Sequence, residues 1–172
     1  MKHFVIALFL FFCACDDSIS VECINNNLSI IKPIWVDPGC EDTARQSIVR
    51  AVETLNELGQ QQVCGPLVEL VGESDNQNRV ICYYTPVSTT HSTTIGFADL
   101  NHMDLYLWRM PDSVHWIESL VLHELMHYIG IEGHTDDFGE SYAVMSSGID
   151  NLVQFTSVDI ELFCEFFDCV NR

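Results

Sequence analysis

The chain has 172 residues, enough for one domain with a hydrophobic core of its own. Its formal charge is −18 at pH 7, because 25 Asp and Glu residues outnumber 7 Lys and Arg residues. This charge excludes nucleic acid as the expected ligand, since phosphate binding needs a positive face. It favours a solvated acidic surface, with a preference for basic substrates as the functional alternative.

Residues 1–15 have the pattern of an export signal. Lys2 gives a positive start, and the apolar run FVIALFLFFCA is too short to span a membrane. The segment ends in CACDDS and resembles a bacterial lipoprotein signal, in which Cys15 would carry a lipid that anchors the protein to the cell envelope. Plain secretion to the exterior, with cleavage nearby, is the alternative. Residues 16–29 are polar and rich in Asn, which indicates a tether or an irregular segment.

Six of the eight cysteines remain when Cys13 and Cys15 are assigned to the signal. An even number of cysteines in an exported chain predicts up to three disulfides. Their spacing matches no zinc knuckle and leaves the connectivity open, and free buried thiols are the alternative. The six are Cys23, Cys40, Cys64, Cys82, Cys164 and Cys169.

Two helices are expected in the first 130 residues. In 41–59, apolar residues recur every three or four positions, which predicts an amphipathic helix that Gly59 caps. A second helix is predicted from Asp112 or Ser113, either of which can cap it, to about Gly130. Strands are predicted at 29–36, 67–71 and 79–84, followed by a hairpin of two short strands at 94–100 and 103–110.

A last helix is predicted at 155–167. Thr156 and Asp159 stand three residues apart at its start, which is a variant of the capping box with Asp in place of Glu. Taken together, the order of strands and helices favours a partly parallel sheet, because helical crossovers connect parallel strands.

The stretch HELMHYIGIEGH carries the candidate site. His123 and His127 are four residues apart, so both imidazoles project from one face of a helix, with Glu124 beside them. Two neutral nitrogen ligands and a carboxylate next to an open position suit a catalytic zinc, whose bound water the carboxylate can deprotonate. Gly130 can end the helix in a left-handed turn, after which the chain can offer His134 as a third ligand.

This stretch resembles HExxHxxGxxH, the signature of the metzincin zinc metalloproteases. Within that family it is similar to matrixin-like catalytic domains. In that signature the third His would fall at residue 133, which is Gly here, so the resemblance implies one added residue at Glu132 or Gly133 and ligation by His134. The later SYAVMSS places Met145 where the family has its Met-turn, an apolar floor below the metal. Some members carry Tyr two residues after this Met as a further ligand, and Ser147 stands there instead.

The resemblance implies an α+β, zincin-like fold. Such a fold has a twisted, mostly parallel five-stranded sheet with an antiparallel edge strand, packed on two helices, and a small C-terminal part with a last helix. It assigns residues 30–172 to a single metalloprotease domain and places 95–100 as the edge strand over the cleft. A protein or peptide substrate could add to that edge in extended form.

The function so implied is that of a monomeric, zinc-dependent endopeptidase. Glu124 would take a proton from the Zn²⁺-bound water as the water attacks a peptide carbonyl, and would deliver it to the leaving amine. The alternative is a catalytically inactive module of the same fold that binds partners at the cell surface. The added residue near Gly133 keeps this alternative open, whereas Glu124 argues against it, because a structural site needs no base.

Three further interpretations stay open at the residue level. Asp136 or Asp137 could ligate the metal in place of His134, since carboxylate oxygen also suits zinc. Met145 could be an ordinary core residue. His91, His102 and His115 have no matching spacing and are predicted to be surface or loop residues.

Overall fold

The computed structural model describes residues 31–72, 78–85, 95–109, 113–135, 143–146 and 152–169. The predicted signal and tether lie outside these ranges. So do the following residues named above: Cys15, Cys23, His91, Asp112, Asp136, Asp137 and Ser147.

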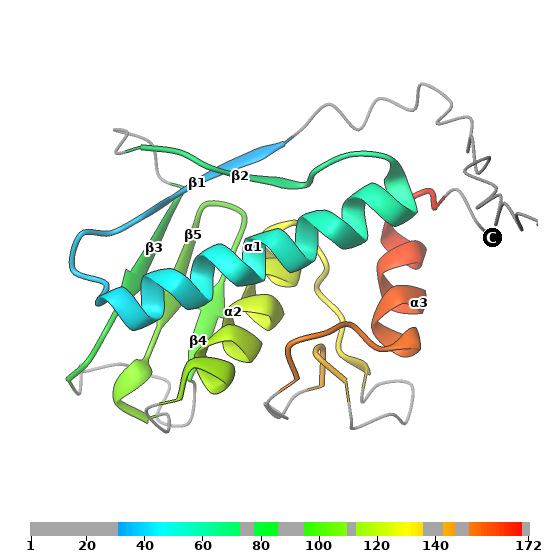
Figure 1. The fold of residues 1–172 in the computed structure, drawn as a ribbon. Coiled ribbons are helices and arrows are strands. Elements are labelled where there is room, and N and C mark those ends of the chain that lie inside the picture. The colour runs from blue at the N-terminus through cyan, green and yellow to red at the C-terminus, as the bar shows by residue number, and fades with distance from the viewer. Residues whose placement is uncertain are drawn as a thin grey trace, which may run out of the picture.

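Five strands form one sheet in the order β2-β1-β3-β5-β4 (Figure 1). The parallel pairs are β1 with β2, β1 with β3 and β3 with β5, whereas β4 is antiparallel to β5 and forms an edge of the sheet. The predicted fold class and the predicted hairpin are therefore confirmed. The strands are Lys32–Val36 (β1), Val68–Leu70 (β2), Arg79–Cys82 (β3), Gly96–Ala98 (β4) and His102–Leu105 (β5).

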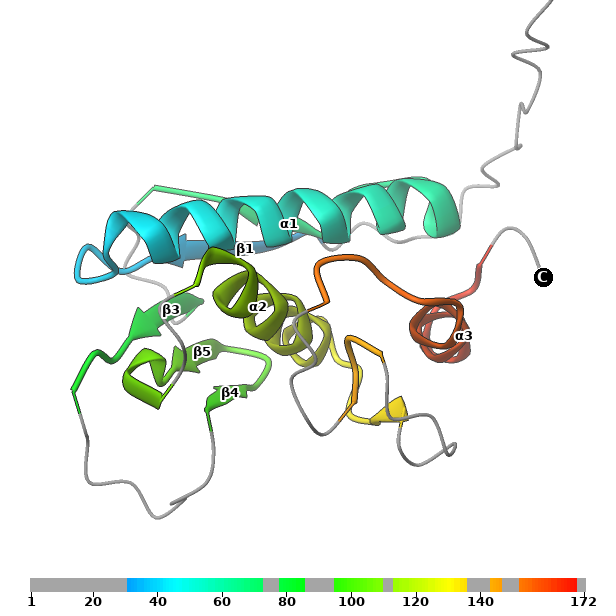
Figure 2. The same cartoon turned by 60° about the horizontal axis from the view of Figure 1, so that its bottom comes forward.

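Within the described ranges, three α-helices accompany the sheet: α1 (Asp42–Val63), α2 (Val114–Tyr128) and α3 (Ser157–Phe166). Figures 1 and 2 show α1 and α2 side by side against the sheet, with α3 standing beyond the far end of α2. The predicted strand at 103–110 is wrong in its second half, where Leu107–Arg109 form a 3-10 turn. The Trp108 amide there donates to the carbonyl of Tyr83 at 3.2 Å, which holds the turn to the residue that follows β3.

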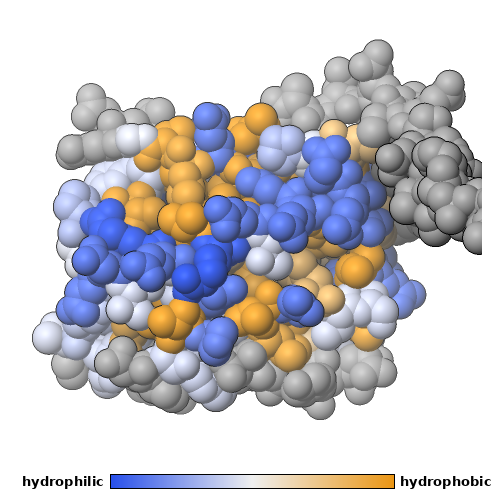
Figure 3. Space-filling model, in the orientation of Figure 1, coloured by the Kyte–Doolittle hydropathy of each residue, from blue (hydrophilic) through white to orange (hydrophobic). Residues whose placement is uncertain are grey.

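The amphipathic pattern predicted for α1 is observed. Its buried residues include Ile48, Val52 and Leu55, and its outer face contributes to a hydrophilic band across the molecule (Figure 3). Burying an aliphatic side chain of this size contributes roughly 1.5–3 kcal/mol. On the opposite side of the core, the sheet supplies Ile34, Val80, Met103 and Leu105.

The predicted cap at Gly59 is wrong. The helix continues through Gly59 to Val63, and Cys64 caps it in the left-handed region with φ 64°. A Cβ atom added to Gly59 would lie 2.8 Å from Cγ of Leu67, so glycine is needed here for the close approach of the chain that leads into β2. The role of Gly59 is therefore packing and not capping.

The capping box predicted for the last helix is confirmed. Thr156 accepts a hydrogen bond from the Asp159 amide, and the Asp159 side chain accepts one from the Thr156 amide. Disulfides join Cys40 to Cys82 and Cys164 to Cys169. Within the described part of the chain, no helix combines the length and the apolar character that a membrane crossing requires.

Candidate metal centre

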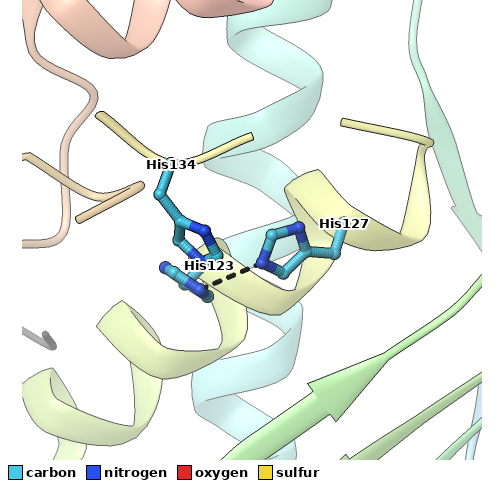
Figure 4. Close-up of side chains that lie close together, drawn as sticks. All are labelled: His123, His127 and His134. Atoms are coloured by element: carbon cyan, nitrogen blue, oxygen red, sulfur yellow. Dashed lines mark hydrogen bonds between the residues drawn. The ribbon is translucent and has the colours of Figure 1, made fainter. Parts of the chain in front are cut away.

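Three histidines converge at the C-terminal half of α2 (Figure 4). His123 and His127 project from the same face of the helix, and their Nε2 atoms lie 3.2 Å apart. The ring centroid of His134, from the segment that follows the helix, lies 5.2 Å from that of His123 and 4.9 Å from that of His127. One nitrogen from each ring can be chosen so that all three lie within 4.8 Å of one another.

The turn after α2 carries His134 back towards the helix. Gly130 has φ 111°, a value that L side chains rarely adopt. Its amide bonds to the carbonyl of His127, and the Ile131 amide bonds to the carbonyl of Met126, as in a Schellman motif. Farther along, the Thr135 amide bonds to the carbonyl of Met145 at 2.8 Å. The segment is therefore fixed on both sides of His134, and the added residue does not keep His134 from the cluster.

Two backbone carbonyls determine which ring nitrogen of His123 and of His127 carries the hydrogen. Nδ1–H of His123 donates to Val144 O at 2.8 Å, and Nδ1–H of His127 donates to Ile131 O at 2.6 Å. A carbonyl can only accept, so each Nδ1 carries the hydrogen and each neutral ring turns an Nε2 lone pair into the cluster. Burial also lowers the pKa of His127 from its ordinary 6.5, which favours the neutral ring.

This donor set fits a divalent transition metal. Two Nε2 lone pairs that face each other at 3.2 Å repel unless a cation or a shared proton lies between them. Neutral imidazole nitrogens are the ligands that zinc takes in catalytic sites with three protein ligands, where the fourth position stays open. The cluster is partly buried rather than enclosed, since His123 is buried and the other two rings are half-buried.

Glu124 lies beside the histidines with only 5% of its surface exposed. Burial raises the pKa of its carboxyl to about 8. The carboxyl group packs against β4, where a Cβ atom added to Gly96 would lie 2.8 Å from Cδ of Glu124. The edge strand can approach the carboxyl group this closely only because residue 96 is glycine.

A cleft runs between the edge strand and the end of α2 that carries His123 and His127, with a cavity volume of about 820 Å³. One wall consists of residues 95–101, which include β4 and the turn to β5. The other wall is formed by His123, Glu124, His127, Ile131, Glu132 and His134. The prediction that residues 95–100 border a cleft above the site agrees with this geometry.

Met145 is fully buried, and it lies in the short segment 143–146 next to the histidine cluster. The remaining described histidines lie elsewhere. His102 on β5 binds Asp99 at 3.1 Å, and His115 is exposed near the start of α2. The exposed His115 agrees with its predicted surface position, whereas His102 is half-buried on a strand.

Sequence reasoning missed two residues that shape the site. Gly96 could have been noticed, because glycine inside a predicted strand signals close approach of another group. Asp159 was singled out only for capping α3. Its carboxylate also accepts the amides of Val144 at 3.1 Å and Met145 at 2.8 Å, a contact between distant parts of the chain that no local pattern announces.

No family model and no curated protein sequence matches this chain. Among solved structures, the chain is similar to a structure of myroilysin, with a TM-score of 0.51 and 10% sequence identity. The match covers 80% of this chain and 92% of the myroilysin chain. At this identity the likeness shows the fold alone. That fold agrees with the predicted mostly parallel five-stranded sheet with an antiparallel edge strand, packed on helices.

Proposed function

We propose that this protein is a zinc-dependent endopeptidase. The observation that carries the proposal is the convergence of three imidazoles and one buried carboxyl group in a cleft bordered by an edge strand. His123, His127 and His134 would hold the ion, and Glu124 would be the general base. The shared fold with a metalloprotease supports this assignment.

Zinc, when bound, would supply a Lewis acid and lower the pKa of a coordinated water towards about 7. The chain's own residues do the rest. The Nδ1–H bonds of His123 and His127 hold the two rings with Nε2 pointed into the cluster. Glu124 needs a nearby positive charge to be ionised at neutral pH, because burial raises its pKa to about 8. Once ionised, it removes the proton of the attacking water and delivers it to the leaving amine.

The edge strand supports a peptide as substrate. Within the described residues β4 pairs only with β5, so its other edge faces the cleft. An extended peptide can add to such an edge through main-chain hydrogen bonds. These bonds can position a scissile carbonyl in the cleft whatever side chains the peptide carries. Gly96 keeps this part of the strand free of a side chain next to Glu124.

The test is the variant Glu124→Gln. It should keep one zinc per chain by elemental analysis and lose hydrolysis of a diverse peptide library by ~100-fold or more, because the ligands remain and the base is gone. Wild-type protein that retains no zinc after reconstitution would refute the metal site.

The alternative is a binding module of the same fold without turnover. In the sequence, the added residue in the turn after Gly130 keeps this alternative open, although the structure still brings His134 into the histidine cluster. Wild-type protein that holds zinc but cleaves no peptide of the library would establish this alternative and reject the endopeptidase.

A further inference from the structure

One buried carboxylate stands behind the histidine cluster without touching it. Asp159 has no exposed surface. Its Oδ1 accepts the Met145 amide at 2.8 Å, and its Oδ2 accepts the Val144 amide at 3.1 Å. Oδ2 also accepts the amide and the hydroxyl of Thr156, both at 2.8 Å. The carboxylate therefore binds the start of α3 and the segment 143–146 at once.

The first path from Asp159 leads to His123 through a single peptide group. The Met145 N–H and the Val144 C=O belong to the same peptide unit. Its N–H donates to Asp159, and its C=O accepts Nδ1–H of His123 at 2.8 Å. A hydrogen bond to a carboxylate is stronger than one between neutral groups, and it polarises the peptide so that the carbonyl becomes a better acceptor.

The second path leads to the segment that carries His134. The carbonyl of Met145 accepts the Thr135 amide at 2.8 Å, one residue beyond His134. Two consecutive carbonyls, of Val144 and Met145, thus hold two of the three histidine segments. His127 differs, because its Nδ1–H bonds to Ile131 within its own turn.

We propose that Asp159 is a positioning residue of the metal centre, which sets the orientation of His123 and the place of His134 by fixing the peptide between Val144 and Met145. This inference rests on the proposed zinc site. Without the carboxylate, the buried amides of Val144 and Met145 lose their acceptor, and a buried amide without a partner is costly. The segment then shifts to find other partners, and the two histidine segments shift with it.

The experiment measures metal affinity in full-length protein. Asp159→Asn keeps the size of the side chain but turns an NH₂ group towards amide donors. We expect its zinc affinity, measured against a competing chelator, to fall ~10–100-fold, the range for losing an outer partner of a ligating histidine. The visible absorption bands of the cobalt-loaded variant should also shift, because the ligand geometry changes.

Two control variants separate positioning from general stability. Thr156→Val removes a hydroxyl from the same capping box and leaves the bonds of Asp159 to Val144 and Met145 in place. Asn56→Ala removes three side-chain bonds to the backbone of Leu67 and Val68, far from the site. Both should lower the melting temperature and leave the zinc affinity and the cobalt spectrum of wild type.

The outcomes are distinguishable. If wild type binds zinc and Asp159→Asn binds it equally well with the same cobalt spectrum, the inference is overturned and the proposed function stands. If the controls lose affinity as much as Asp159→Asn, Asp159 acts only through stability, and the inference is overturned as well. If wild type binds no zinc, the proposed function is refuted, and the inference about Asp159 is refuted with it.

A measurement on wild type covers the case in which Asp159→Asn does not fold. In metal-free protein, the bonds to Asp159 should protect the amide hydrogens of Val144 and Met145 from exchange with solvent. Exchange of both amides at the rate of an unfolded chain would overturn the inference.

Discussion

Gly96 and Glu124 show how much one missing methyl group matters at the site. A Cβ atom at residue 96 would also lie 2.8 Å from Cδ1 of Leu120, so Glu124 cannot be the sole group to yield. We predict that Gly96→Ala lowers peptide hydrolysis by ~100-fold or more, since a misplaced group costs on this scale. Its zinc affinity should stay near that of wild type, because the atoms nearest to the added Cβ belong to Glu124 and Leu120 and not to a histidine. Steady-state kinetics and a chelator titration measure the two quantities.

The matched control is Gly65→Ala, because a Cβ atom at Gly65 would meet no heavy atom within 4 Å. It should keep wild-type hydrolysis. Equal activity of Gly96→Ala and Gly65→Ala would show that β4 has room beside Glu124.

The buried carboxyl of Glu124 should also make the stability of metal-free protein depend on pH. Burial raises its pKa from 4.5 to about 8, so the folded protein binds more protons than the unfolded chain between these values. The free energy of unfolding therefore falls as the pH rises through this window and levels off above it. Urea denaturation should show this decline for wild type relative to Glu124→Gln. Parallel curves for the two proteins would contradict the raised pKa.

At the residue scale, the sequence alone predicts those features of the site that depend on the spacing of residues within one helix. His123 and His127 face one way because four residues make about one helical turn, and the sequence alone shows this. The approach of Gly96 to Glu124 and of Asp159 to Met145 depends on how separate segments pack, so spacing cannot supply it.

Among the elements, the turn after α2 decides whether the site has three histidines. Its backbone bonds at Gly130, Ile131 and Thr135 hold it on both sides of His134. We predict that His134→Ala weakens zinc binding by more than the ~10–100-fold that an outer partner costs. Asp136→Ala and Asp137→Ala should bind like wild type in the same chelator titration. If His134→Ala bound zinc like wild type and either aspartate variant did not, the third ligand would be a carboxylate and not His134.

The helix α1 shows where a local pattern misleads. Apolar spacing ends at Leu58, and the following Gly59 has the look of a cap. The helix nevertheless runs on to Val63, because its last turn packs beside the chain that enters β2. The capping box of α3 was predictable, since both of its partners lie within one turn.

At the scale of the whole molecule, the order of strands and helices predicted a partly parallel sheet, and the family resemblance added the five strands and the antiparallel edge. The pairing of cysteines could not be predicted, because Cys40 and Cys82 are 42 residues apart and meet only when β3 lies beside β1. The disulfides Cys40–Cys82 and Cys164–Cys169 support an oxidising, extracytoplasmic location, which we propose for this protein.

We also propose that Cys15 carries a lipid that anchors the protein to the cell envelope. The protein made in a bacterial host with its signal intact should partition into detergent, and mass spectrometry should find diacylglycerol on Cys15. A mature chain that begins at another residue and stays in the aqueous phase would show plain secretion instead.

Asp159 follows all three histidines along the chain, and this order has a consequence in time. Synthesis starts at the N-terminus, so the three histidines are made before Asp159. Asp159 is the carboxylate that we propose to position His123 and His134. During synthesis and export, the nascent protein would hold metal only loosely until α3 docks. The proposed metal centre would thus be completed late, after α1, α2 and the sheet have been synthesised.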